Sequence, residues 1–201
     1  MSGFKRPKTA ARNLAIANTK TICVTRGMPN YSDSILRHEK EVNRLHRALH
    51  EAVKHRDKSP TLREKWIRAA AEYRNHHSSV DDWLEDIRTS EIADWADARD
   101  FVFQYMEIDP IYNNSGYAKE MMVQKIKKCE LTKKEAQILR RLIIGRIRSV
   151  AWRDFRRFCQ LIPRIQNKVF VDEITTYAES QDDSVSRRAT FAMQYLSTKR
   201  D

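Results

Sequence analysis

Apolar residues recur at intervals of three and four along most of the chain, which is the period of an amphipathic α-helix. In the first run, which begins at Asp33, the apolar positions are Ile35, Val42, Leu45, Leu49, Ala52 and Val53. In the second run they are Leu62, Trp66, Ala69, Ala70 and Tyr73. Between the runs, Ser59 and Pro60 are typical of a helix N-cap and a first helical position. Two helices joined by so short a turn lie antiparallel, so the pattern predicts an αα-hairpin.

The helical period continues on both sides of residues 109–116, "DPIYNNSG", which form the clearest loop. Helices are expected from Ser79, after Ser90, and then at 117–129, 133–150, 151–162, 168–179 and 184–198. Thr132 and Glu135 form a capping-box signature at the start of the helix expected at 133–150. The sequence therefore predicts an all-α fold of about eight helices, with a short strand only at residues 20–27.

One C-terminal segment, "DDSVSRRATFAMQYL" (residues 182–196), carries a resemblance to a known repeat. An Asp precedes the helix, and the apolar positions that follow are Val185, Ala189, Ala192, Met193 and Leu196. This segment resembles the second helix of a HEAT repeat, although Ser186 stands where that repeat usually has an Arg. The resemblance implies stacked, loosely HEAT-like helical pairs in the C-terminal half and implies no function.

Composition supports the helical reading and narrows the class of protein. The 201 residues include only 4 Gly and 5 Pro, while 32% are charged, which favours long helices over a sheet. No apolar run reaches the roughly 20 residues of a membrane span, so no membrane association is expected. The three cysteines (Cys23, Cys129 and Cys159) are too few and too widely spaced for a disulfide framework. We therefore expect an intracellular protein, cytoplasmic or nuclear.

The net charge of +11 is distributed in blocks. Residues 1–31 hold six basic and no acidic residues, and residues 119–168 hold 15 basic against 4 acidic. Residues 79–118, here called the acidic block, hold 10 acidic against 2 basic residues. We expect a basic, flexible or extended arm at 1–31, a helical lobe at 32–116 and a basic helical lobe at 117–201, with one shared core as the alternative to two lobes. The acid-free arm also resembles a mitochondrial targeting segment, which leaves that compartment open.

The helix expected at 133–150 separates its apolar and basic residues onto opposite faces. Lys134, Arg141 and Arg148 recur at seven-residue intervals opposite the apolar arc, and the next helix places further arginines outside. Because the Arg guanidinium binds phosphate oxygens in pairs, such rows suit a nucleic-acid backbone. The expected contacts are Lys134, Arg140, Arg141, Arg148, Arg153, Arg156 and Arg157, with Lys125, Lys127 and Lys128 upstream and Lys5, Arg6, Lys8 and Arg12 from the arm. Tyr31 and Tyr112 are the candidates for stacking on bases.

These residues favour a non-enzymatic protein that binds a nucleic acid, RNA rather than duplex DNA, in a ribonucleoprotein or coat-like assembly. The main alternative is a helical protein-interaction scaffold. In that reading the basic face docks on an acidic partner, on the acidic block of its own chain, or on the acidic block of a second copy, which would give head-to-tail self-association.

Signals for chemistry are few. His46 and His50 are four residues apart, but no third metal ligand accompanies them, so no metal and no cofactor are expected. Arg44 and His50 have the Arg-x(4–6)-His spacing of HEPN ribonucleases, and this resemblance implies a remote ribonuclease alternative. Leu45 stands where those enzymes usually have a polar residue. Arg99 and Arg146 lie within apolar arcs and are interpreted as structural, Arg99 paired with Asp94 or Asp100 and Arg146 reaching water at a helix end.

Overall fold

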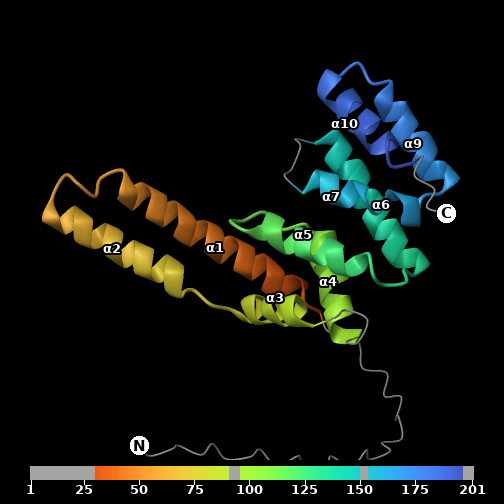
Figure 1. The fold of residues 1–201 in the computed structure, drawn as a ribbon. Coiled ribbons are helices and arrows are strands. Elements are labelled where there is room, and N and C mark those ends of the chain that lie inside the picture. Colours follow the sequence, from red (N-terminus) through yellow and green to blue (C-terminus); the bar gives the residue numbers. More distant parts are fainter. Residues whose placement is uncertain (1–29, 91–95, 150–153, 197–201) are drawn as a thin grey trace, which may run out of the picture.

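The computed structural model describes residues 30–90, 96–149 and 154–196, and these residues form helices and the turns between them (Figure 1). The helices are α1 (Ser32–Val53), α2 (Pro60–Asn75), α3 (Ser79–Thr89), α4 (Ala96–Ile108), α5 (Ser115–Ile126), α6 (Lys133–Arg148), α7 (Phe155–Cys159), α8 (Ile162–Ile165), α9 (Lys168–Ala178) and α10 (Asp183–Met193). The all-α class expected from the sequence is confirmed, with ten helices in the described residues in place of about eight. The strand expected at 20–27 lies outside the described residues.

Helices α1 and α2 run antiparallel and form the αα-hairpin that the sequence predicts (Figure 1). Helix α2 begins where expected, because Ser59 Oγ accepts a hydrogen bond from Leu62 N at 3.2 Å and Pro60 follows at the first helical position. Leu45 and Ala52 of α1 are buried, whereas Ala70 is the buried residue of α2. The hairpin extends away from the other helices, so much of α2 faces solvent on all sides but one (Figure 1).

The core forms where α4 packs against α6. Five residues of α4 are at most 1% exposed, namely Ala98, Phe101, Val102, Tyr105 and Met106. They meet the apolar face of α6, where Leu139, Ile143 and Ile147 are fully buried as the projection of that helix predicts. Helices α7 to α10 pack around the rest of α6, and the buried residues form one continuous cluster from Ile35 to Ala192. This cluster joins residues from both of the expected lobes.

The loop after α4 is held against the hairpin. Asn43 donates a hydrogen bond from Nδ2 to the Ile111 carbonyl at 2.7 Å, and Glu39 accepts one from Ile111 N at 2.8 Å. Asp109 and Asn114 in this loop have φ values of 53° and 70°, in the left-handed region that Asp and Asn tolerate better than most residues. These contacts fix how the hairpin sits relative to the core.

One expectation about the C-terminal half is corrected. The single helix expected at 151–162 is two short helices in the described residues, α7 and α8, which meet at a turn near Gln160. Pro163 lies in the first turn of α8, where its ring does not clash with a preceding helical turn. Helices α9 and α10 do pack as a pair, and Asp182 caps α10 by accepting hydrogen bonds from Ser184 N and Val185 N. A HEAT-like stacking of further pairs stays a prediction.

None of the helices in the described part of the chain is both long and apolar enough to cross a bilayer.

Candidate nucleic-acid interface

The outer face of α6 carries several residues of the expected basic surface. Its first turn carries the expected capping box: Thr132 Oγ1 accepts from Glu135 N at 3.3 Å, and the Glu135 carboxylate accepts from Thr132 N at 2.7 Å. The helix therefore starts at a fixed residue, which sets the rotation of every side chain after it. Lys134, Arg141 and Arg148 are all exposed, as their spacing predicts.

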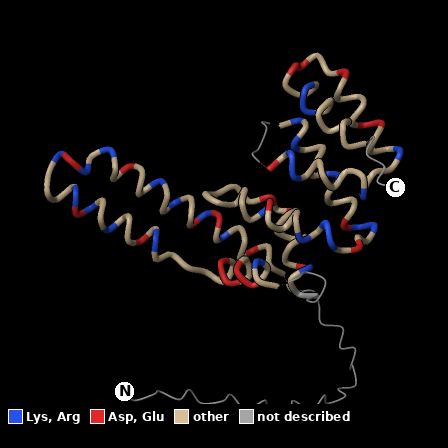
Figure 2. Tube along the Cα trace, in the orientation of Figure 1, with Lys and Arg blue, Asp and Glu red and all other residues tan. Residues whose placement is uncertain are grey.

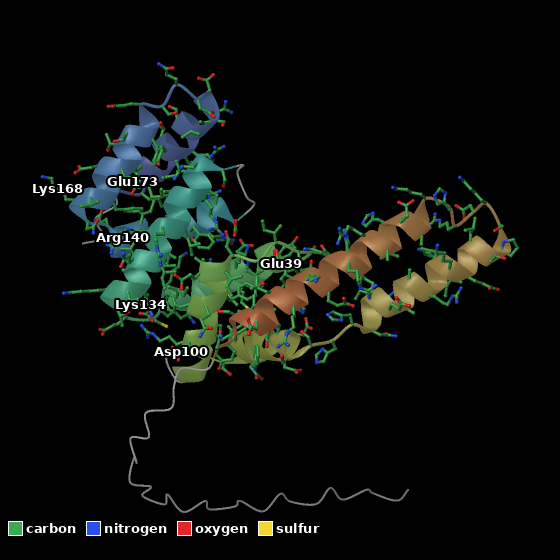
Figure 3. All side chains as sticks on the ribbon, turned by 180° about the vertical axis from the view of Figure 1, so that it is seen from behind. Glu39, Asp100, Lys134, Arg140, Lys168 and Glu173 are labelled. Atoms are coloured by element: carbon green, nitrogen blue, oxygen red, sulfur yellow. The ribbon has the colours of Figure 1, made fainter. Side chains whose placement is uncertain are left out.

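A groove between α6 and the start of α9 gathers three of the expected arginines. It has a volume of about 540 Å³, and Arg140, Arg141 and Arg148 line it from α6. From the other side it is lined by Asn167, which caps α9 by accepting a hydrogen bond from Phe170 N at 2.9 Å, and by Glu173. Figure 3 labels Arg140 and Glu173, which belong to the two helices that flank the groove. The positive end of the α9 dipole adds to the charge of the arginines, and Glu173 opposes it.

Several of the expected contacts are already engaged within the chain. Arg141 pairs with Glu107 of α4 at 2.7 Å, and both side chains are about half exposed or more, at 62% and 49%. Arg157 pairs with Glu120 of α5. Arg140 is half-buried, not fully exposed, and donates a hydrogen bond to the Ile165 carbonyl at 2.9 Å. Each of these arginines keeps its charge but has a partner that a ligand must replace or share.

The lysines before α6 are held in the same way. Lys125 donates to the Ser90 carbonyl and Lys127 to the Gln160 side chain, so they tie α5 to α3 and α7. Lys128 is exposed and also has an interaction within the chain. We therefore assign these three lysines a structural contribution in addition to their charge.

Three expected residues remain available. Lys134, Arg148 and Arg156 are exposed, and none has a hydrogen bond or ion pair to the described residues. Lys5, Arg6, Lys8, Arg12 and Arg153 lie outside the described residues. Lys134 lies in the first turn of α6, Arg148 lines the groove and Arg156 lies on α7, so available basic side chains occur on both helices.

The two tyrosines expected to stack on bases are half-buried and engaged with other aromatic rings, which does not favour that expectation. Tyr31 packs edge-on against Trp83 and Phe101, with ring centroids 4.8 and 5.4 Å away. The Tyr112 hydroxyl is 2.7 Å from that of Tyr105, and burial raises the pKa of Tyr112 to about 12. The sequence alone does not separate exposed aromatic residues from core ones, and tertiary packing partly covers both rings.

A buried ion cluster accounts for Arg146 and was missed by the sequence reasoning. Arg146 is 2% exposed and donates to Asp109 at 2.8 Å and to Asp154 at 3.2 Å, so the expectation that it reaches water is wrong. Lys119, also buried, binds the same Asp109 oxygen at 2.7 Å. The Arg146 guanidinium also lies 3.9 Å from the centre of the Phe158 ring. An Arg on the apolar arc of α6 was the signal for this cluster, but its partners are distant in sequence.

Arg99 also has a partner that the sequence did not identify. It forms a two-point ion pair with Glu135 at 2.5 and 2.7 Å, not with Asp100, while Asp94 lies outside the described residues. This pair joins α4 to the capping box of α6. The ion pairs of Arg146 and Arg99 therefore hold the basic helix α6 in position. Neither arginine is part of the outer face of α6.

Some acidic residues of the acidic block pair with residues on or next to α3, and others pair with arginines of α6. Figure 2 shows acidic positions gathered on α3 and basic positions along α6. On α3, Glu85 pairs with Arg88 of the same helix and Asp82 with His77, whereas Glu107 and Asp109 reach Arg141 and Arg146 of α6. The chain thus neutralises part of its basic helix, and the acidic face of α3 stays on the surface.

The residues that could suggest a metal site or a ribonuclease, namely Arg44, His46 and His50, each contact a neighbouring residue on α1. His46 and His50 lie with their Nε2 atoms 3.0 Å apart, and no third metal ligand joins them among the described residues. Arg44 makes a two-point ion pair with Glu41, at 2.9 and 2.7 Å. The HEPN-like pair of Arg44 and His50 is therefore engaged with two different neighbours on α1.

No protein-family model, curated protein or solved structure matches the chain.

Proposed function

We propose that the protein binds the phosphate backbone of a nucleic acid, RNA in preference to duplex DNA, along α6 and α7 and in the groove between α6 and α9. The observation that carries the proposal is the convergence of Arg140, Arg141 and Arg148 on one concave surface of about 540 Å³. Pockets of this size accommodate small polar ligands such as a nucleotide unit. Guanidinium groups that line a concave surface bind phosphate in two-point contacts better than isolated surface charges do.

The contacts that Arg141 makes within the chain do not prevent this binding. Its ion pair with Glu107 is exposed to solvent, and exposed pairs of this kind contribute less than about 1 kcal/mol. A phosphate can therefore replace or share the carboxylate at small cost. Arg148, Lys134 and Arg156 need no such exchange.

We expect contacts to the nucleic-acid backbone without selection among bases, because the described surface presents few groups that could recognise a base. Tyr31 and Tyr112 are half-buried and already packed against other aromatic side chains, so they are poorly placed to stack on a base. The sequence has no helix-turn-helix or zinc-finger signature that would place a helix in a major groove. Flexible single-stranded RNA can follow the curved basic face more closely than stiff duplex DNA, which is the basis for ranking RNA first.

Binding along one RNA molecule would also suit a ribonucleoprotein or coat-like assembly. The acidic face of α3 carries Asp82, Glu85 and Asp86, which are all exposed. A second copy could place this face against the basic face of α7 in its neighbour, which would give head-to-tail contacts between bound copies.

The proposal is tested by fluorescence anisotropy with labelled single-stranded RNA, duplex RNA and duplex DNA. The variant Arg148→Glu/Arg156→Glu reverses two exposed charges that have no partner among the described residues. Its matched control is Arg63→Glu/Arg68→Glu, which makes the same change in net charge on the exposed side of α2.

We expect the α6–α7 variant to bind single-stranded RNA at least tenfold more weakly than the control variant does. Equal weakening by the two variants would mean that only net charge matters and that the proposed face is not a site. No binding to any of the three nucleic acids at low salt would exclude the proposal.

A protein partner is the second candidate, and one observation favours it. A groove of about 420 Å³ runs along the hairpin, lined by apolar residues that include Leu49, Val53 and Trp66 and flanked by Arg56 and Arg74. Such a groove suits the apolar face of an acidic helix. Hydrogen exchange separates the two candidates, because an RNA ligand would protect α6 and α9 whereas a helical partner would protect α1 and α2.

A further inference from the structure

Three potential metal ligands converge where the hairpin joins the core. His38 lies on α1 and is 4% exposed, His76 is the residue that ends α2, and Asp81 lies in the first turn of α3. One ligand atom of each residue lies within 4.8 Å of the corresponding atoms of the other two, and no other such trio occurs in the described part of the chain. The trio thus draws one ligand from each of three separate helical elements.

The histidine at the end of α2 lacks the hydrogen bond that its burial requires. His76 Nε2 is buried and has no hydrogen-bond partner among the described residues. A buried ring nitrogen without a partner is unfavourable, and native proteins rarely contain one without a reason. The His76 ring stacks on His38, with ring centroids 5.7 Å apart and planes at 29°. The trio therefore contains a buried histidine with one ring nitrogen that has no partner among the described residues.

The other two residues are held in place by the cap of α3. His38 Nδ1 lies 2.8 Å from Ser78 Oγ and 3.7 Å from Asp81 Oδ2. Asp81 Oδ2 accepts from Ser78 N at 2.8 Å, which completes the capping box. Because a carboxylate has two oxygens, Asp81 can keep this bond with one oxygen and bind an ion with the other.

The distances fit a small ion that binds nitrogen and oxygen. Zinc takes ligands at about 2.0–2.2 Å in a tetrahedron, which places neighbouring ligand atoms about 3.4 Å apart. Ligand atoms that lie within 4.8 Å of one another would have to move closer together, to about 3.4 Å, when such an ion binds. Two histidines and a carboxylate also form a three-ligand set that leaves the fourth position for water.

A small pocket connects the two histidines of this trio to solvent. It has a volume of about 300 Å³ and is lined by His38, His76 and Ser78 together with Ser34, Arg37 and Glu41. Arg37 and Glu41 bring one charge of each sign, so Asp81 supplies the net negative charge that a cation needs. The Tyr112 ring packs edge-on against His38 at 4.8 Å and fixes the orientation of the imidazole.

We propose that His38, His76 and Asp81 bind a divalent transition-metal ion of the zinc type, with a fourth position open to the pocket. The ion would cross-link α1, the end of α2 and the start of α3. It would then fix the hairpin to the core. The nucleic-acid face lies on other helices, so this site stands independently of the proposed function.

The test is a Zn²⁺ titration of the full chain by calorimetry, with a competing chelator and after metal removal. All proteins in the test carry His46→Gln/His50→Gln, which removes the histidine pair on α1. The ligand variants are His76→Ala, which removes the unpaired nitrogen, and Asp81→Asn, which keeps an acceptor for the cap of α3. The matched control is His77→Ala, because His77 is exposed and pairs with Asp82 at 2.8 Å without a third ligand.

We expect one Zn²⁺ per chain and a rise in the midpoint of thermal unfolding with Zn²⁺ concentration. Each ligand variant should bind more weakly than its parent by more than the roughly 100-fold that loss of an outer-shell partner can cost. His77→Ala should bind as the parent does. The proposal is overturned if the parent has no such site, if either ligand variant keeps it, or if His77→Ala weakens it equally.

Discussion

At the scale of single residues, burial separates two kinds of arginine on the same helix. Arg146 is 2% exposed and is bound by Asp109 and Asp154, whereas Arg148, two residues later, is exposed. Periodicity predicted which of them faces inward. It could not predict the partners, because Asp109 is 37 residues away and meets Arg146 only once α4 and α6 are packed.

The buried cluster should be important for stability. Asp154→Ala leaves the Arg146 charge inside the protein with one fewer partner, and breaking a buried pair in this way costs about 3–5 kcal/mol. Glu107→Ala also removes a carboxylate from an α6 arginine, but that pair is exposed and should cost less than about 1 kcal/mol. Urea unfolding of the two variants measures the difference. Equal losses would contradict the role given to the buried cluster.

Glu135 provides a second prediction at this scale. Burial by itself would raise its pKa, but hydrogen bonds from Arg99 and Thr132 outweigh burial and hold the pKa below its ordinary value. A lowered carboxyl pKa adds stability above the unfolded value of about 4.3 and loses it as pH falls through the folded value. Wild type should therefore exceed Glu135→Gln in free energy of unfolding at pH 7, and the two should converge below about pH 4. A difference that does not change with pH would contradict this.

At the scale of elements, caps and apolar periods were sufficient to predict most helices. Ser59, Thr132 and Asp182 each cap the helix that the sequence assigns to them. The break between α7 and α8 was missed, because the apolar spacing continues across Gln160 while the helix does not. The sequence also did not predict the groove between α6 and α9, because the groove depends on how these two helices pack against each other.

The hairpin should be the least stable helical element. In α2 only Ala70 is buried, while α6 has a continuous buried face. Amide hydrogen exchange followed by mass spectrometry should therefore show faster exchange in α2 than in α6. Equal protection of α2 and α6 would contradict this prediction and would indicate that a second copy of the chain covers the hairpin.

At the scale of the whole molecule, charge is sorted by helix. Acidic residues gather on α3 and basic residues on α6 and α7, and Glu107 and Asp109 of the acidic block pair with α6. The blocks of charge were evident in the sequence. The sequence did not show which basic residues remain available. In the fold Arg140 and Arg157 have partners, whereas Arg148 and Arg156 have none among the described residues.

The salt dependence of RNA binding tests the central claim most directly. Log affinity for single-stranded RNA should fall linearly with log salt concentration, and Arg148→Ala should reduce the magnitude of the slope by about 0.7, the value for one phosphate contact. Arg68→Ala on the exposed side of α2 serves as the control and should leave the slope unchanged. Affinity that does not respond to salt, or the same slope for wild type and Arg148→Ala, would contradict a phosphate-binding groove between α6 and α9.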